Sequence, residues 1–201
     1  MTTVRVPQEE RTRAMRTRLL EATIECLVDV GFSGTSTTLV SQRAGVSRGA
    51  QLHHFPTKDS LVLAAVEHLA VARGQEIEKA AAGLSARADR TRAVLDLLAA
   101  HFTGQIFTAA LELWVAARTD AQLLAAVGPL EQRIGREIHR QTVEMLGADE
   151  SVPGTRELVQ ATLDLVRGLG LANTISDDQR RRARILDRWA LVLDQHLKEK
   201  A

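Results

Sequence analysis

The sequence predicts an all-α fold, and three observations lead to it. The 201 residues are rich in Ala, Leu and Arg, while aromatic residues make up only 3% and there are four prolines. Apolar residues recur at intervals of three and four along most of the chain, which is the period of an amphipathic helix. Ser, Thr and Asp stand where they can accept hydrogen bonds from the free backbone N–H groups at helix starts. With 45% hydrophobic and 25% charged residues, the chain is expected to fold rather than to stay disordered.

The N-terminal segment divides into an arm and a first helix. Residues 1–9 have no helical periodicity and are expected to form a flexible arm, in which Arg5 either enters a DNA minor groove or takes no part in binding. From Glu10 to Val30 apolar side chains return at helical spacing, and Gly31 is expected to end this helix. The apolar positions are Leu20, Ile24, Leu27 and Val28.

The segment 36–58 predicts two short helices joined by a tight turn. The first is expected from Thr37 to Ala44, and Gly45 can take the positive φ angle of a tight turn without steric cost. The second is expected from Arg48 to Phe55, because Pro56 disfavours the helical conformation at the residue before it. This is the helix-turn-helix pattern, whose second helix lies in the major groove of DNA. A corner in an ordinary helical bundle is the alternative interpretation.

Side chains of the predicted second helix match the chemistry of base edges. Arg48 can pair with guanine or a phosphate, Gln51 can read adenine or face solvent, and the methyl group of Ala50 can contact thymine. Gly49 lets the backbone approach closely. We therefore expect this helix to read a DNA sequence.

Linked motifs within residues 10–62 carry a family resemblance. In chain order they are Gly31-Phe32, the run from Thr35 through Ala44-Gly45-Val46-Ser47, and His53-His54-Phe55-Pro56-Thr57-Lys58-Asp59-Ser60-Leu61. This part of the chain resembles the DNA-binding domain of the tetracycline-repressor (TetR) family of regulators. Three positions depart from the family pattern. Ser41 replaces a small alanine, Gln51 replaces an apolar residue, and Leu52 replaces a tyrosine that often meets the DNA backbone.

The resemblance implies further DNA contacts. His54 and Lys58 match family positions that commonly meet phosphates, and Thr37 and Thr38 lie near the helix start that usually does so. Candidate DNA-binding residues are therefore Thr37, Thr38, Ser47, Arg48, Gly49, Ala50, Gln51, His53, His54 and Lys58. The expected partner is a double-stranded DNA operator.

The rest of the chain is interpreted as a connecting helix and a helical body. Thr57 is placed to cap a long helix. After a break near Gly83, helical periodicity returns and continues toward the C-terminus, with the clearest loop at 147–154. The predicted parts are a flexible arm (1–9), a helix-turn-helix DNA-binding domain (10–56), a connecting helix (57–82) and a helical domain (83–201).

The resemblance assigns effector binding and dimerisation to the C-terminal helical domain. Helices near 155–173 and 178–197 are expected to pair with their copies in a homodimer, although packing within one chain is the alternative. A small-molecule effector of unknown identity is expected among apolar helices that carry polar or aromatic groups, although each such group can instead serve core packing or surface charge. The candidate ligand-binding residues are His101, Phe102, Phe107, Trp114, Arg118 and Asn173. Repression of a palindromic operator, relieved by the ligand, is the family's majority mode, with activation or a co-repressor ligand as alternatives.

Net charge, cysteine content and the lack of long apolar stretches indicate which kinds of protein this chain can be. The net charge is +1, so the chain is not a general polyanion binder. Cys26 is the single cysteine, which excludes an intrachain disulfide and is expected to be a small buried residue. The N-terminus lacks an apolar signal core, and no stretch of about eighteen apolar residues occurs, so a cytoplasmic protein without a membrane span is expected.

An enzyme is not expected. The six histidines are scattered, which predicts no metal site, and neither a nucleophile elbow nor a phosphate loop is present, so no cofactor is predicted. Arg180, Arg181, Arg182 and Arg184 begin a helix and are expected to form a charge network with nearby aspartates rather than to bind nucleic acid. A helical protein-interaction module that has lost DNA binding is the alternative function, because of the three departures from the family pattern.

Overall fold

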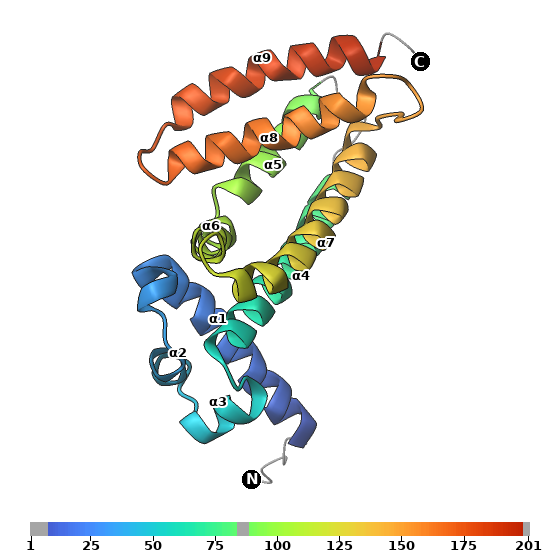
Figure 1. Ribbon diagram of the computed structural model, residues 1–201. Coiled ribbons are helices and arrows are strands. Elements are labelled where there is room, and N and C mark those ends of the chain that lie inside the picture. Colours follow the sequence, from blue (N-terminus) through green and yellow to red (C-terminus); the bar gives the residue numbers. More distant parts are fainter. Residues whose placement is uncertain (1–7, 84–88, 199–201) are drawn as a thin grey trace, which may run out of the picture. The chain divides into compact units, whose positions relative to one another are not determined.

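A computed structural model describes residues 8–83 and 89–198, and the predicted all-α fold is confirmed there. The described residues form nine helices and no strand (Figure 1). The helices are α1 (Gln8–Gly34), α2 (Thr37–Ala44), α3 (Arg48–His54), α4 (Lys58–Ala82), α5 (Arg90–Phe102), α6 (Gln105–Ala117), α7 (Ala121–Leu146), α8 (Thr155–Asn173) and α9 (Gln179–Lys198).

The chain forms two compact units. The first comprises the described residues up to Ala70 together with Thr108–Leu130, and the second comprises the described residues of Val71–Phe107 and Glu131–Ala201. The boundaries run within α4, α6 and α7, so each of these helices contributes to both units. The functional division predicted from the sequence stays a prediction. Of the predicted arm, residues 1–7, including Arg5, lie outside the described part of the chain. Its last two residues, Gln8 and Glu9, form the first turn of α1 instead.

The core of the first unit begins on α1. Leu19, Leu20 and Leu27 of this helix are buried, and α2 packs against α1. At Gly31 the backbone leaves the helical region, with φ 69° and ψ 178°, which confirms the predicted end of the regular helix. Cys26 is fully buried, and this burial raises the pKa of its thiol, so the interpretation of a small buried residue is confirmed.

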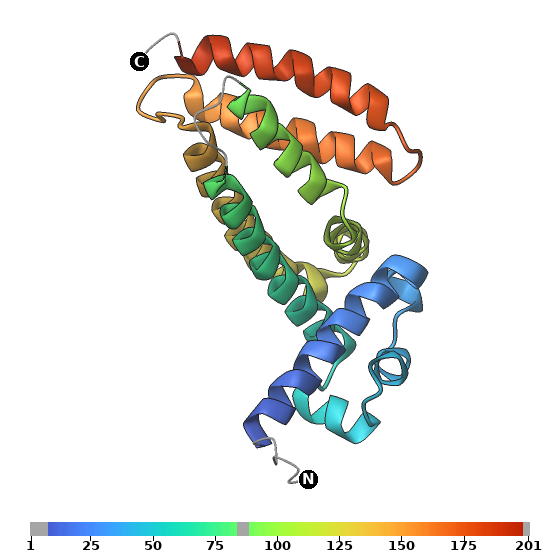
Figure 2. The same ribbon diagram turned by 180° about the vertical axis from the view of Figure 1, so that it is seen from behind.

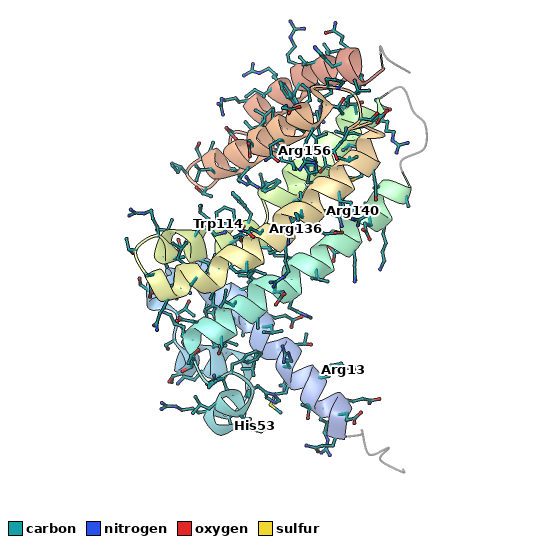
Figure 3. The ribbon with its side chains drawn as sticks, turned by 45° about the vertical axis from the view of Figure 1, so that its right-hand side comes forward. Arg13, His53, Trp114, Arg136, Arg140 and Arg156 are labelled. Atoms are coloured by element: carbon teal, nitrogen blue, oxygen red, sulfur yellow. The ribbon has the colours of Figure 1, made fainter. Side chains whose placement is uncertain are left out.

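The second unit is built around a helical hairpin. Figure 2 shows α8 and α9 side by side, with α5 next to α8. The backbones of α8 and α5 approach closely at Gly170, because a Cβ atom there would lie 2.2 Å from the carbonyl oxygen of Phe102 at the end of α5. In the same unit, Arg140 of α7 (labelled in Figure 3) forms an ion pair of 2.9 Å with Glu78 of α4.

Candidate DNA-binding site

The helix-turn-helix is held by local hydrogen bonds from its own short side chains. Ser36 Oγ accepts from the backbone N–H of Leu39 at 3.1 Å and caps α2. Gly45 ends α2 in the left-handed conformation, with φ 62° and ψ 38°. Ser47 Oγ then accepts from the backbone N–H of Ala50 at 3.3 Å and caps α3. The predicted capping and turn are therefore confirmed.

The outer face of α3 is formed by a small group of side chains. Arg48, Gly49, Leu52 and His53 are exposed, while Ala50 and His54 are half-buried. Leu52 keeps 41% of its surface exposed, which is a large apolar exposure for the centre of a seven-residue helix. Figure 3 shows His53 on the outside of this helix. The face thus offers a cation, an imidazole and an apolar side chain to a partner.

Gln51 does not belong to that face, and the interpretation of Gln51 as a reader of adenine is corrected here. Its side chain is fully buried. Its Nε2 atom donates a hydrogen bond of 2.6 Å to the backbone carbonyl of Phe55 at the end of α3. The physical reason is helical spacing, since Gln51 and Phe55 are four residues apart and share the inward face. The apolar residue usual at this family position was the sequence signal for burial.

Lys58 has protein partners inside the first unit. Its Nζ atom donates a hydrogen bond of 2.7 Å to the backbone carbonyl of Phe32 and lies 3.9 Å from the centroid of the Phe32 ring. The predicted phosphate contact of Lys58 stays a prediction. The same holds for Thr37, Thr38 and Ser47, which lie at the starts of α2 and α3.

Arg43 is a charged residue of α2 that the sequence interpretation did not assign. Its guanidinium pairs with Asp29 of α1 at 2.6 Å and reaches Glu25 at 4.0 Å. The hydrogen bond to Asp29 raises the pKa of Arg43. This pair ties the end of α2 to α1, so it supports the orientation of the helix-turn-helix rather than adding a free cation.

Three of the candidate ligand-binding residues form one aromatic cluster. The ring centroids of Phe102 and Phe107 are 5.4 Å apart, and those of His101 and Phe102 are 5.0 Å apart. The guanidinium of Arg167, which the sequence interpretation missed, lies 5.5 Å from the centroid of Phe102. Helical periodicity could not reveal this contact, because α5 and α8 are brought together only by the fold.

The other three candidates lie elsewhere. The Oδ1 atom of Asn173 accepts a hydrogen bond of 2.8 Å from Arg182, which links the end of α8 to the start of α9. Trp114 is half-buried and Arg118 is exposed, and both belong to the first unit. The ligand-binding assignment of all six residues stays a prediction.

A groove of about 810 Å³ runs over α8 and α9. Its floor is mainly apolar, and three arginines stand along it. Its lining residues are Ala161, Asp164, Leu165, Arg181, Arg184, Ile185, Arg188, Trp189 and Val192. Arg181 and Arg182 pair with Asp178 at 2.7 and 3.3 Å, which agrees with the expected charge network at the start of α9.

The described part of the chain shows neither a metal cluster nor a single helix that could span a membrane. Residues 8–83 and 89–198 contain no group of three or more His, Cys, Asp or Glu side chains that could hold a metal ion. Across the same ranges no single helix is long and apolar enough to span a membrane, whereas α5 and α6, bent by 54° at their junction, together meet that test by length and composition only.

Two capped helices that meet at a left-handed glycine, with an exposed face on the second helix, define a helix-turn-helix DNA-binding protein. The family model described as bacterial regulatory proteins of the tetR family matches residues 19–65. The chain is 30% identical over 191 residues to the HTH-type transcriptional regulator CymR of Pseudomonas putida, and the match covers 92% of each protein. The chain therefore belongs to the tetR family of DNA-binding transcriptional regulators.

Other relatives agree with this assignment. BetI of Burkholderia cenocepacia, also an HTH-type transcriptional regulator, is 24% identical over 172 residues, which cover 85% of this chain and 88% of BetI. Among solved structures, a transcriptional regulator from Rhodococcus sp. Rha1 superposes with a TM-score of 0.69 at 22% identity, over 90% of this chain and 96% of that one. A TetR family member from Streptomyces coelicolor A3 superposes with a TM-score of 0.66 at 22% identity, over 87% of this chain and 97% of that one. These relatives are regulators rather than enzymes.

Proposed function

We propose that the protein is a cytoplasmic homodimeric repressor that binds a palindromic operator and leaves it when a small molecule binds. The observation that carries the operator contact is the exposed face of α3. Arg48 at its start can pair with guanine, and Leu52 and Ala50 can contact thymine methyl groups. The helix is short, so few side chains reach bases, and contacts to phosphates set its orientation.

The groove over α8 and α9 supports the proposed homodimer. Its apolar floor is open to solvent in a single chain, and Leu171 and Leu191 nearby are 49% and 53% exposed. Large exposed apolar surfaces mark interaction sites in soluble proteins. A second copy of the same hairpin can cover the groove by two-fold symmetry. The two copies of α3 then read half-sites about 34–36 Å apart, which makes the preferred operator a palindrome.

The aromatic cluster of α5, α6 and α8 supports an effector site in the second unit. Phe102 and Phe107 present buried rings, and Arg167 adds a cation beside them. Two proteins of the same fold were solved with small molecules: EbrR with ethidium, and FadR of Bacillus subtilis with stearoyl-CoA. A ligand releases DNA only when it binds the non-DNA-binding conformation more tightly than the other.

Selection of bound duplexes from a random pool tests this function. The purified protein is expected to enrich a palindrome whose half-sites lie about one helical turn apart. Binding of that duplex should fall steeply with salt, because phosphate contacts release counterions. Sedimentation should give two protein chains per duplex. No enrichment, with a monomer in sedimentation, would contradict the proposal and favour a helical protein-interaction module that has lost DNA binding.

A further inference from the structure

The backbone of Phe32, just after the interruption of α1, is held from two sides by opposite charges. Its N–H group donates a hydrogen bond of 3.1 Å to Glu112 Oε2 of α6. Its carbonyl group accepts the hydrogen bond of 2.7 Å from Lys58 Nζ, at the first residue of α4. The ring of the same residue lies under that ammonium group, 3.9 Å away. One residue therefore links a carboxylate of α6 to an ammonium group of α4.

The sequence leaves room for this carboxylate. Gly31 precedes Phe32, and a Cβ atom on Gly31 would lie 2.8 Å from Glu112 Oε2. Any side chain at this position would displace Glu112 or the backbone, and φ of 69° would be strained for other residues. The close approach allows the carboxylate to reach the N–H group of Phe32 directly.

Both hydrogen bonds involve a charged group, and such bonds are shorter and roughly twice as strong as bonds between neutral groups. Both are also partly buried, which reduces competition from water. The carbonyl oxygen of Phe32 also accepts a hydrogen bond of 3.3 Å from the backbone N–H of Thr35, which lies two residues before the start of α2. Phe32 therefore has hydrogen bonds to α4, to α6 and to the segment that leads into α2.

We propose that Glu112 is a positioning residue of the DNA-binding site, which acts on Lys58 through the backbone of Phe32. The inference rests on the proposed function, in which the ammonium group of Lys58 contacts an operator phosphate. A lysine ammonium group has three N–H donors, and the carbonyl of Phe32 occupies one. The other two N–H donors of Lys58 are available to the phosphate. Glu112 determines their position because it holds the backbone of Phe32, to which Lys58 is bonded.

The test is a double-mutant cycle on operator affinity, with the palindrome selected by the wild-type protein as the probe. Glu112→Ala is expected to weaken binding about fivefold, the loss of one positioned hydrogen bond. In a Lys58→Ala background, Glu112→Ala is expected to change affinity by less than about twofold, because its effect passes through Lys58. Glu112→Gln should stay within about twofold of wild type, because the amide oxygen still accepts from Phe32.

Glu21→Ala is the matched control, since Glu21 is an exposed glutamate of α1, and operator affinity should not change. If Glu112→Ala does not unfold cooperatively, Glu112→Asp replaces it, because the shorter side chain withdraws the carboxylate from Phe32. Full additivity with Lys58→Ala, or unchanged affinity in the Glu112 variants of a protein that does bind its operator, overturns this inference alone. If the wild-type protein selects no operator, both this inference and the proposed function fall.

Discussion

Gln51 and Phe55 are joined inside the helix-turn-helix by a hydrogen bond of 2.6 Å from the side-chain amide of Gln51 to the carbonyl oxygen of Phe55. The amide oxygen, Oε1, is buried and has no hydrogen-bond partner among the described residues. A buried polar group without a partner costs free energy, so Gln51 stabilises the end of α3 on one side and weakens it on the other. A charged side chain in place of the Gln51 amide would therefore be buried with even less compensation.

Gln51→Glu is therefore expected to destabilise the protein by about 3 kcal/mol at neutral pH, because a buried carboxylate would face the carbonyl oxygen of Phe55. Leu52→Glu is the control, since it adds the same charge one residue away on the exposed face and should change stability by less than about 0.5 kcal/mol. Urea denaturation of both variants measures the difference. Equal stability of the two variants would show that Gln51 is not buried in solution.

The sequence was sufficient for features that depend on neighbouring residues. The capping residues Ser36 and Ser47 and the turn at Gly45 act on backbone groups within a few residues, so their chemistry can be recognised along the chain. Helical periodicity likewise located most helix boundaries to within a few residues.

Partners that are distant in sequence could not be predicted in this way. Phe32 and Glu112 are 80 positions apart, and Phe32 and Lys58 are 26 apart. Periodicity places each residue on a face of its own helix, but it does not say which faces meet. For this reason a family motif was enough to single out Lys58 as a candidate phosphate contact. The contacts of Phe32 with Lys58 and with Glu112 became visible only in the structure.

Arg48 is expected to contribute sequence-specific affinity. Arg48→Ala should weaken binding of the selected operator by about 1–3 kcal/mol and relax the preference at one position of each half-site. Repeating the duplex selection with the variant measures both effects. Arg180→Ala removes an exposed arginine of α9 and serves as the control, with unchanged selection. A uniform loss of affinity without a change in the selected sequence would instead assign Arg48 to a phosphate.

Leu52 is expected to contact the methyl group of a thymine. Replacing operator thymines one at a time by deoxyuridine removes only that methyl group, and one replacement should weaken wild-type binding about fourfold. The same replacement should have little effect on Leu52→Ala, because the contacting side chain is already absent. Titration of each duplex by fluorescence anisotropy gives the four affinities. Equal losses in both proteins would rule out a contact through Leu52.

Glu150 is expected to titrate at an unusually low pH. The hydrogen bond of 2.7 Å with the ring of His139 holds the pKa of the Glu150 carboxyl below its usual range, and Arg156 adds to this effect from 3.2 Å. Because the folded-state pKa is lowered, the stabilisation is present above the unfolded-state pKa and is lost as pH falls through the folded-state pKa.

His139→Ala should therefore raise the pKa of Glu150 in an NMR titration of the side-chain carboxyl carbon, and it should make acid unfolding less steep. Removal of an unrelated histidine, His196 of α9, should leave the titration of Glu150 unchanged. An unchanged titration after His139→Ala would show that the carboxyl is governed by Arg156 alone.

Gly170 and Gly168 lie on the same helix and are expected to respond oppositely to alanine. A Cβ atom at Gly170 would lie 2.2 Å from the carbonyl oxygen and 2.9 Å from the carbonyl carbon of Phe102, and backbone atoms cannot move aside as a flexible side chain can. Gly170→Ala must therefore push α8 away from α5, at a cost of about 2 kcal/mol or more. At Gly168 no such atom lies within 4 Å, so Gly168→Ala should stabilise the helix by about 0.5–1 kcal/mol. Urea denaturation measures the free energy of unfolding of the two variants. If both variants are more stable than the wild type, α5 and α8 do not pack closely in solution.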